Sequence, residues 1–470
     1  MLRKHCNRWL LIVVLALMLG ACIPYSFSPP KEVHIDPGDS VRWPQIAVDA
    51  EGVSHIVGVV NDRIVYYRTR YGEPIITATF TMSESGTDWK QYSPGIAVTD
   101  NRTAYLVWIE QRGGPEKFAC YRNLTYIPPI GGWTRYCNPL DGNIQTTGNL
   151  KVIARGDKAY AVYDRIYTGD PNGRIGELMY KELTQPTNTG RVYSYLDHLE
   201  TAFIYSLDLG IDSQGYLHVG FHDNYTPAGS PTYNERLSLH SNVIRYDGDM
   251  AQHWFIYEGN ELDEVVPVSL SFHLDSADVE RVALASVSQN TPTRDLIFID
   301  SCVANGCTGQ NSHLVTLPSS WSTYSVIDEV EILGIEQTLY LSFTGFDSVI
   351  PQQVYFMEAY SSNTPTNLSQ TDDTWKFTLE MTKVVGRDPS FPVSFTAIAW
   401  IESDLTSKTN YYVSDGFFNK TMVFSKYCDP VFSVGNISSN GIYLSGAWLD
   451  CGDTWFSTQA WTNQLPLIMK

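Results

Sequence analysis

The sequence predicts an all-β fold, a β-propeller of about eight four-stranded blades. Three observations lead to this prediction: a motif that recurs along the chain, many short strands, and almost no helical periodicity. Aromatic residues make up 13% of the 470 residues and charged residues only 18%. This composition is typical of aromatic and β-branched strands rather than of amphipathic helices.

The recurring motif is a strand, a turn and a second strand. It reads PQIAVDAEGVSHIV over residues 44–57 and PGIAVTDNRTAYLV over residues 94–107, without a gap. A third copy, LGIDSQGYLHVG over residues 209–220, restores the Asp-x-x-Gly-x-x-His spacing of the first. In this spacing Asp49 is expected to cap the turn and Gly52 to supply a positive φ. Each copy therefore predicts a hairpin of two neighbouring strands.

Eight such units follow one another at the spacing typical of four-stranded blades. The second strands read HIVGVV, AYLVWIE, AYAVYD, LHVGFHD, RVALASV, LYLSFTG, FTAIAWIE and IYLSGAWLD. The third strands read RIVYYRT, FACYRN, ELMYKE, NVIRYD, DLIFID, QVYFME, NYYVSD and TWFSTQ. A fourth strand is weakly visible, for example as TATFTM near Thr77. Seven blades is the alternative, because the unit around Phe395 is poorly bounded.

Ring closure is expected to involve the N-terminal segment. A single four-stranded sheet cannot bury both of its faces, whereas radial stacking buries them and closure protects the edges. The last unit runs out of chain soon after TWFSTQAW, so KEVHID at residues 31–36 is expected to complete the ring.

The N-terminus has the pattern of an export signal. Arg3, Lys4 and Arg8 precede an apolar run over residues 9–21, which is short for a membrane crossing. The run ends in LGAC at residues 19–22, which resembles the lipobox of bacterial lipoproteins. The resemblance implies a signal peptide over residues 1–21, a lipidated Cys22 with a tether over residues 22–40, and a single propeller domain over residues 41–470.

The protein is therefore expected to be exported and anchored by its lipid to the cell membrane or the outer membrane, facing outward. An ordinary secretory signal or an uncleaved anchor is the alternative.

The chain has 32 basic and 51 acidic residues and a formal net charge of −19. So acidic a surface repels polyanions, and we expect no nucleic-acid partner.

The cysteines fit an exported chain. Of the eight, Cys6 would leave with the signal and Cys22 would carry lipid, which leaves six. Six cysteines allow fifteen connectivities, and neighbours in sequence are the favoured choice. No CxxC spacing supports the rival interpretation, metal binding. The predicted disulfides are Cys120 with Cys137, Cys302 with Cys307, and Cys428 with Cys451.

The motif P-x-IAVD-x-x-G-x-x-H-I-V, followed by an I-x-Y-Y strand, resembles the sialidase-like (BNR-repeat) β-propellers. The resemblance covers nearly all of residues 40–462 and is clear in the first, second and fourth units. That family's Asp-box, S-x-D-x-G-x-T-W, is similar to residues 450–455, although Trp448 stands where the box has its Ser. A weaker echo is residues 84–89. The box implies a structural turn, and so bears on the fold and not on activity.

One further resemblance concerns catalysis. Val41-Arg42-Trp43-Pro44 is similar to the family's F/Y-R-I-P motif. The resemblance implies that Arg42 pairs with a sugar carboxylate in an exo-sialidase-type glycoside hydrolase. The family also needs two more arginines, a tyrosine nucleophile with its glutamate, and an aspartate, and no motif marks these in this sequence. The alternative is that Arg42 is an exposed strand residue stacked on an aromatic neighbour such as Trp43.

Acidic residues end the second strand in five units, three of them just after a Trp. On a propeller these residues would lie near one face, at the loops that join second and third strands. A functional interpretation is a ring of carboxylates beside indoles that binds sugar hydroxyls or a cation. A structural interpretation is that each acid accepts hydrogen bonds within its own loop. The candidate ligand-binding residues are Glu110, Asp164, Asp223, Glu402 and Asp450, with Trp108, Trp400 and Trp448.

No cofactor is expected, although DPNG at residues 170–173 has the composition of either a Ca²⁺ loop or an ordinary turn. His55 and His218 occupy equivalent strand positions, which favours packing over metal binding.

The sequence as a whole predicts a non-catalytic binding module for a glycan, a peptide or an envelope protein. An exo-sialidase using Arg42 is the alternative, and a scaffold without a small ligand is a third hypothesis.

Overall fold

A computed structural model describes the following residues of the chain: 31–33, 42–70, 89–114, 116–124, 138–140, 145–146, 148–166, 175–198, 200–227, 234–246, 249–255, 268–288, 295–302, 311–314, 326–346, 352–361, 365–369, 374–385, 394–404, 408–414, 420–427, 434–439, 443–450 and 453–460. All elements within these residues are β-strands. The predicted all-β class is therefore confirmed. The signal segment, residues 71–88 with the expected strand near Thr77, and the 170–173 turn lie outside the described residues.

The strands form small antiparallel sheets in chain order. The first half contains β2 (Arg42–Val48), β3 (Val53–Val60), β4 (Arg63–Arg70); β5 (Trp89–Val98), β6 (Ala104–Arg112), β7 (Lys117–Leu124), β8 (Asn138–Pro139); β9 (Leu150–Arg155), β10 (Lys158–Ile166), β11 (Ile175–Glu182), β12 (Thr189–Ser194); and β13 (Glu200–Ile211), β14 (Leu217–Pro227), β15 (Asn234–Tyr246), β16 (Asp249–Phe255).

The second half continues the pattern and returns to the N-terminus. It contains β17 (Val268–Leu274), β18 (Glu280–Ser288), β19 (Asp295–Cys302), β20 (Asn311–Leu314); β21 (Val326–Ile335), β22 (Thr338–Phe346), β23 (Gln353–Glu358), β24 (Thr366–Asn367); β25 (Thr374–Val385), β26 (Ser394–Asp404), β27 (Lys408–Ser414), β28 (Lys420–Tyr427); and β29 (Val434–Ser439), β30 (Tyr443–Asp450), β31 (Asp453–Ala460), with β1 (Lys31–Val33).

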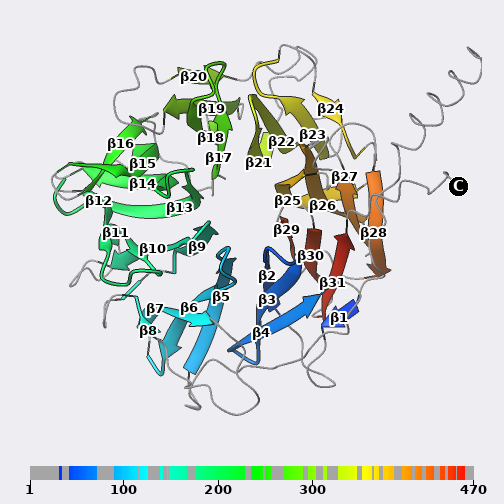
Figure 1. Cartoon of the computed structure of the whole chain (residues 1–470), viewed down its shortest axis with the longest axis horizontal. Helices are drawn as coiled ribbons and strands as arrows, with labels where there is room; N and C mark the ends of the chain where they lie inside the picture. Colours follow the sequence, from blue (N-terminus) through cyan, green and yellow to red (C-terminus); the bar gives the residue numbers. More distant parts are fainter. Residues whose placement is uncertain are drawn as a thin grey trace, which may run out of the picture.

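The sheets stand around a common axis, as Figure 1 shows, with the first strand of each unit nearest the centre. These first strands contact one another in chain order: β2, β5, β9, β13, β17, β21, β25 and β29, after which β29 contacts β2. Because strands alternate in direction, the turns joining first to second strands share one face, here called the first-turn face. The first strands begin at the opposite face, here called the starting face. This radial arrangement of sheets is that of a β-propeller.

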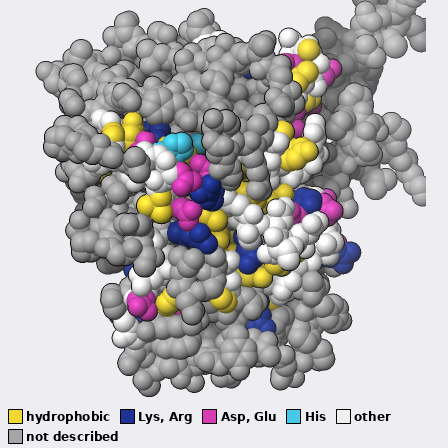
Figure 2. Space-filling view, turned by 90° about the vertical axis from the view of Figure 1, so that its left-hand side faces the viewer, with side chains coloured by type: hydrophobic (Ala, Val, Ile, Leu, Met, Phe, Trp, Pro, Cys, Tyr) yellow, Lys and Arg dark blue, Asp and Glu magenta, His cyan; other side chains and the backbone are white. Residues whose placement is uncertain are grey.

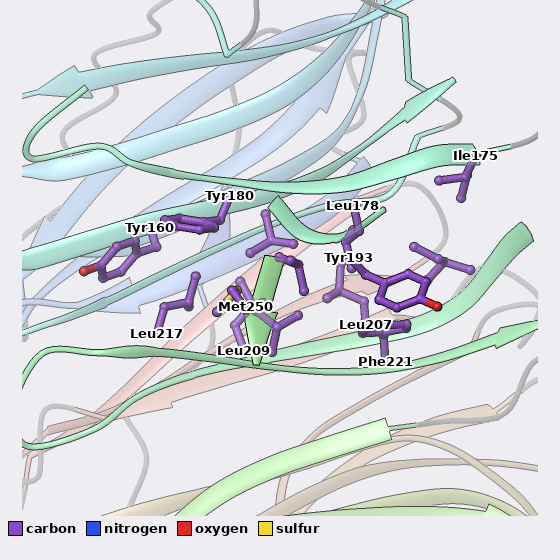
Figure 3. Close-up of a cluster of buried hydrophobic side chains, with 14 of the residues drawn as sticks. Tyr160, Ile175, Leu178, Tyr180, Tyr193, Leu207, Leu209, Leu217, Phe221 and Met250 are labelled. Carbon is purple, nitrogen blue, oxygen red and sulfur yellow. The ribbon is translucent and has the colours of Figure 1, made fainter. Parts of the chain in front are cut away.

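The hydrophobic core lies between neighbouring sheets rather than at a single centre. One buried cluster joins Val57 and Tyr66 of β3 and β4 to Trp108 of β6. Another joins Phe356 of β23 to Trp400 of β26. Figure 3 shows the cluster that β10–β14 and β16 share. Each sheet therefore buries its faces against its neighbours, as expected for radial stacking.

Two of the four-stranded units are joined into one eight-stranded sheet. Strand β11 pairs with β13 at Ile175 and Ala202, and β12 pairs in parallel with β16 at Arg191 and Asp249. Arg191 Nε lies 3.0 Å from Asp249 Oδ1 at this junction. Figure 2 shows acidic, basic and histidine side chains grouped on this side of the molecule. The sequence motif predicted the units but not this connection between them.

The ring closes through the N-terminal strand, as predicted. Strand β1 pairs antiparallel with β31, with Lys31 opposite Phe456 and Val33 opposite Thr454. The final sheet thus has the order β1-β31-β30-β29. Because β1 falls within residues 22–40, part of the segment expected to be a tether belongs to the propeller instead.

Candidate functional site

The predicted acids occupy equivalent places in the structure. Glu110, Asp164, Asp223, Glu402 and Asp450 all lie at or near the end of a second strand, toward the starting face. The first four are at most 1% exposed. The side chains of Asp450 and Trp448 lie outside the described residues. These residues thus share one register on the second strands, and the chemistry of each acid depends on its partners.

Glu110 is connected to the preceding sheet through a glutamine. Gln91 Nε2 donates to Glu110 Oε2 at 2.9 Å. Gln91 Oε1 in turn accepts the backbone N–H of Ile64, on strand β4, at 2.7 Å. The carboxylate therefore orients the glutamine that joins the β5–β8 sheet to β4.

Asp164 has a comparable role one unit later. It accepts hydrogen bonds from the Thr146 hydroxyl and, at 3.2 Å, from Asn149 Nδ2. The backbone N–H of Thr146 donates to the carbonyl oxygen of Lys117, in strand β7 of the preceding sheet, at 3.0 Å. Asp164 thus fixes a segment that bridges two sheets.

Asp223 pairs with a buried arginine. Arg236 Nε and Nη2 donate to the two carboxylate oxygens of Asp223 at 3.1 and 2.6 Å. Arg236 Nη1 donates to the Tyr193 hydroxyl of strand β12 at 3.0 Å, and it lies 3.1 Å from Glu200 Oε2. Burial alone would lower the pKa of Arg236, but Asp223 raises it well above its ordinary value. The guanidinium therefore stays charged while it joins two units.

Glu402 accepts a hydrogen bond from the indole of Trp400. Trp400 Nε1 donates to Glu402 Oε1 at 2.9 Å. Trp400 is 1% exposed and packs among Phe356 and Leu368 of the preceding sheet. Trp108, which is 0% exposed, occupies the same kind of place between β3, β4 and β6. Both indoles fill the space between neighbouring sheets. A ligand could contact them only if the two sheets separated, so their role in ligand binding stays a prediction.

The four described acids thus share one structural role. Each fixes a side chain or segment that contacts the sheet before it. This arrangement supports the structural interpretation of the repeated acids, although their connections reach further than their own loops. Binding of a ligand by these residues stays a prediction.

Arg42 begins strand β2, where its backbone pairs with Val59. Its side chain lies outside the described residues. The expected stacking of Arg42 on Trp43 and the expected pairing of Arg42 with a sugar carboxylate therefore both stay predictions. Trp43 itself is 45% exposed.

The first-turn face carries a cavity of about 720 Å³. Four consecutive units line it, and their first strands contact one another around the ring, so the cavity lies beside the axis. Its walls combine apolar side chains with charged and hydroxyl groups. The residues that line it include Arg155, Ser213, Gln214, Phe272, His273, Asp278, Val279, Glu280, Leu333, Gly334 and Glu336.

An ion pair crosses the wall of this cavity. Arg155 Nη1 lies 3.3 Å from Glu280 Oε1 and donates to the carbonyl oxygen of Ile211 at 2.7 Å. The backbone N–H of Ser213 donates to Glu280 Oε2 at 2.8 Å, and the Ser213 hydroxyl donates to the same oxygen. The Arg155 guanidinium also lies 5.9 Å from the centre of the Phe272 ring. Three neighbouring units are therefore connected at the cavity wall.

The cavity has an excess of carboxylates. Asp278 and Glu336 are exposed at its rim and have positive φ values of 57° and 53°. Gln337 Nε2 donates to Asp278 Oδ1 at 2.9 Å. With Glu280 these acids give the lining three carboxylates against one guanidinium, that of Arg155. Such a lining accepts hydrogen bonds from hydroxyl or ammonium groups and disfavours anions.

A second cavity, of about 450 Å³, lies on the same face. It is lined by residues 46–50, 96–100 and 152–156, which are equivalent segments of three consecutive units. Arg155 lines both cavities. The recurring motif therefore has two roles, because it builds the sheets and its turns line the cavities near the axis.

The turn chemistry expected from the motif is confirmed. Asp49 Oδ1 accepts the backbone N–H groups of Glu51 and Val53, each at 2.9 Å, and Gly52 has a φ of 78°. His55 Nε2 lies 3.4 Å from Asp49 Oδ2. Burial alone would raise the pKa of Asp49, but the His55 hydrogen bond and the backbone N–H groups hold it below its ordinary value.

The later copies repeat this turn with variations. Asp212 accepts the backbone N–H groups of Gln214 and Tyr216, and His218 Nε2 lies 3.1 Å from its other oxygen. In the next unit Asp275 forms the turn, and Arg281 stands where the others have histidine, with Nη1 3.8 Å from Asp275 Oδ2. Both histidines thus serve as partners of a turn aspartate.

No group of three or more potential metal ligands occurs among the described residues. The possible Ca²⁺ loop at residues 170–173 lies outside them. The described part of the chain has no helix long and apolar enough to cross a membrane.

One predicted disulfide can be placed in part. Cys120, on β7, is fully buried and lies opposite Pro139 of β8. Cys137, its expected partner, is two residues before Pro139 but lies outside the described residues. The pairing of Cys120 with Cys137, like those of the other cysteines, stays a prediction.

Neither a family model nor a curated protein matches this sequence. Among solved structures, prolyl oligopeptidase B from Galerina marginata is 11% identical with a TM-score of 0.46, over 96% of this chain and 59% of that one. The Hadza microbial sialidase Hz136 is 11% identical with a TM-score of 0.39, over 86% and 73%. The sialidase of Trypanosoma rangeli is 8% identical with a TM-score of 0.32, over 93% and 58%.

These solved structures are β-propeller proteins. This chain spans about three fifths of the length of the oligopeptidase. Because all three TM-scores are below 0.5, no conclusion about fold, activity or ligand rests on these similarities.

Proposed function

We propose that this chain is a binding module, an exported β-propeller anchored through a lipid on Cys22, that binds a glycan or an envelope protein on its first-turn face. The observation that carries the proposal is the cavity of about 720 Å³ beside the axis. Cavities of this size are typical of ligand sites, and the wall of this one is shared between polar and apolar groups. Arg155, Glu280 and Ser213 connect three units there, so the wall is held in place before a ligand arrives.

The propeller has eight blades in this proposal. Support comes from the closed circuit of eight first strands and from the division of the eight-stranded sheet into β9–β12 and β13–β16. The relationship to the sialidase-like repeat propellers rests on sequence motifs alone, chiefly those at residues 41–57 and 450–455.

The chemistry of the cavity narrows the ligand class. Three carboxylates face one guanidinium that is already paired, so an acidic sugar would meet repulsion. Hydroxyl groups or a cationic side chain would find acceptors in Asp278, Glu280 and Glu336. Phe272, Val279 and Leu333 supply the apolar wall. A neutral glycan or a basic peptide segment fits this lining.

Site-specific crosslinking tests the proposal. A photoreactive phenylalanine is placed at Val279, which is 41% exposed in the cavity lining, and at Tyr360, which is 49% exposed and does not line it. Each variant of residues 23–470 is irradiated with solubilised envelope and with biotinylated neutral glycans. A discrete adduct at Val279 that is absent at Tyr360 supports the proposal. Equal labelling at both positions, or none at Val279, contradicts it.

The sialidase alternative is tested separately by hydrolysis of a fluorogenic sialoside by residues 23–470 and by the Arg42→Ala variant. Turnover that vanishes in the variant would replace the binding proposal with catalysis. Absence of turnover in both proteins would leave Arg42 as a strand residue.

A further inference from the structure

Five first strands carry a β-bulge in the half that lies toward the starting face. The register shifts in β2 between Arg42 and Gln45 and in β5 between Tyr92 and Gly95. Comparable shifts occur in β13, β21 and β25. A bulge disrupts regular pairing and redirects the side chain of the extra residue. The ends of these five first strands that lie toward the starting face therefore depart from regular pairing.

Trp43 stands out among these bulge residues. Its φ is 49°, in the left-handed region, and its side chain is 45% exposed. A bulky residue in this region is a backbone outlier that costs about 1–3 kcal/mol. Ser93 occupies the equivalent bulge of β5 with a φ of 50°. The bulge is thus a general feature of the fold, whereas the large aromatic side chain at it belongs to β2.

Full burial does not account for the indole at this place, because Trp43 is 45% exposed. A Trp that stabilises the fold is normally buried, as Trp108 and Trp400 are here. Trp43 instead combines an unfavourable backbone conformation with an exposure of 45%. Strained and exposed residues of this kind are typical of binding sites. A second aromatic, Phe203 on β13, is also exposed toward the starting face, at 36%.

We propose that Trp43 is the stacking platform of a second binding site, at the end of β2 on the starting face, for a ring of a neutral oligosaccharide. The flat indole offers an apolar surface to the C–H face of a sugar ring and keeps an N–H for a hydroxyl group. The net charge of −19 disfavours acidic sugars. This site lies at the opposite face from the cavity around Arg155 and Glu280, so it is independent of the function proposed above.

The test is calorimetric titration of residues 23–470 with cellohexaose, chitohexaose and mannohexaose. The wild type is expected to bind at least one of them. Trp43→Ala is expected to weaken that binding by about tenfold or more. Tyr360→Ala, which removes an aromatic of similar exposure elsewhere, is expected to leave it unchanged. Absence of binding to all three by the wild type, or equal binding by Trp43→Ala, overturns the proposal.

Two more variants distinguish sugar binding by Trp43 from a structural role of its side chain and from sugar binding at the opposite face. Trp43→Gly is expected to lose binding without a fall in Tm, because Gly adopts a φ of 49° without strain. A fall in Tm by several degrees would assign Trp43 a structural role and overturn the proposal. Glu280→Gln changes only the cavity on the first-turn face. A loss of oligosaccharide binding in Glu280→Gln but not in Trp43→Ala would assign the sugar to that cavity instead.

Discussion

Arg236 illustrates, at the scale of single residues, how this fold uses charge. The guanidinium is 4% exposed, so its desolvation must be balanced by partners. Asp223 accepts two hydrogen bonds, and the ring centre of Tyr225 lies 4.2 Å from the guanidinium carbon. Tyr193, on the neighbouring unit, accepts a third hydrogen bond. The ion pair lies within one unit and orients Arg236, which connects that unit to its neighbour through Tyr193, and the energy of the pair depends on both partners being present.

Removal of one member of this pair is expected to be costly. Arg236→Met leaves Asp223 buried without its cation, and we expect a loss of about 3–5 kcal/mol in the apparent free energy of unfolding. The double variant Asp223→Leu/Arg236→Met should recover part of that loss. Urea denaturation measures both. Lys151→Met, which breaks an exposed pair with Asp208, is the control and should change stability by less than about 1 kcal/mol.

His222 predicts an acid-sensitive step in stability. Burial lowers its pKa to about 4, while the neighbouring Asp223 acts in the opposite direction. In the unfolded chain a histidine has a pKa of about 6.5. Between pH 6.5 and 4 the unfolded state therefore binds a proton that the folded state does not bind. The contribution of His222 to the free energy of unfolding is fully present above pH 6.5 and decreases as the pH falls toward 4. The loss is about 3 kcal/mol at most.

Denaturation midpoints at several pH values between 7.5 and 4.5 test this expectation. His222→Gln should flatten the dependence on pH in that window, because it removes the titrating ring. Asp49 and Asp212 affect the free energy of unfolding at lower pH than His222 does. Their pKa values are lowered in the folded state, so their contribution is lost only as the pH falls below about 4. An unchanged slope in His222→Gln would refute the role of this residue.

Sequence patterns located the acids but not their partners. Glu110, Asp164 and Asp223 end equivalent strands, and that register is visible in the sequence. Their partners come from different places: Gln91 from a first strand, Thr146 from the segment between two sheets, and Arg236 from a third strand. No fixed spacing relates these positions. Contacts of this kind depend on how neighbouring sheets stack, which a repeat pattern does not specify.

At the scale of the element, the first turn is the most predictable part of the fold. An aspartate that caps the turn and a glycine with positive φ were both expected from the motif, and both are present at Asp49 and Gly52. The cavities that these turns line were not expected. Arg155 does not belong to any recognisable motif. It contacts Glu280 because the ring brings the turns of neighbouring units together beside the axis. Local chemistry determines the turn, whereas the cavity depends on the whole ring.

Gly334 marks a close approach between two such elements. A Cβ added there would lie 1.9 Å from the carbonyl oxygen of Phe272, on the neighbouring strand β17. The backbone cannot move easily, because Gly334 N–H donates to the Ser271 hydroxyl at 2.9 Å. Gly334→Ala is therefore expected to lower the free energy of unfolding by about 3 kcal/mol, and to weaken binding at the cavity that both residues line.

Thermal denaturation and the crosslinking assay measure these two effects. Gly156→Ala is the matched control. Gly156 has a φ of 62° but no neighbour within 4 Å of an added Cβ, so only backbone strain of about 1–2 kcal/mol is expected. Equal losses in the two variants would show that the β17–β21 approach is looser than the structure indicates.

At the scale of the whole molecule, closure of the ring distinguishes this chain from an open stack of sheets. Strand β1 is the outermost strand of the last sheet, although it begins the described chain. The pairing of β1 with β31 agrees with the expectation that the N-terminal segment completes the ring. The sequence did not indicate that β11 and β12 would pair with β13 and β16, because those strands belong to separate repeats.

Removal of β1 is expected to destabilise the ring and to expose an edge. The chain starting at residue 34 lacks the pairing of Lys31, Glu32 and Val33 with β31, at about 1 kcal/mol for each hydrogen bond lost. The free edge of β31 would then recruit other chains. We expect a lower Tm and aggregation that increases with protein concentration, measured by calorimetry and light scattering. The chain starting at residue 29 keeps β1 and should match residues 23–470. Identical behaviour of the 34–470 chain would mean that the contacts between β29 and β2, rather than the β1 pairing, hold the ring closed.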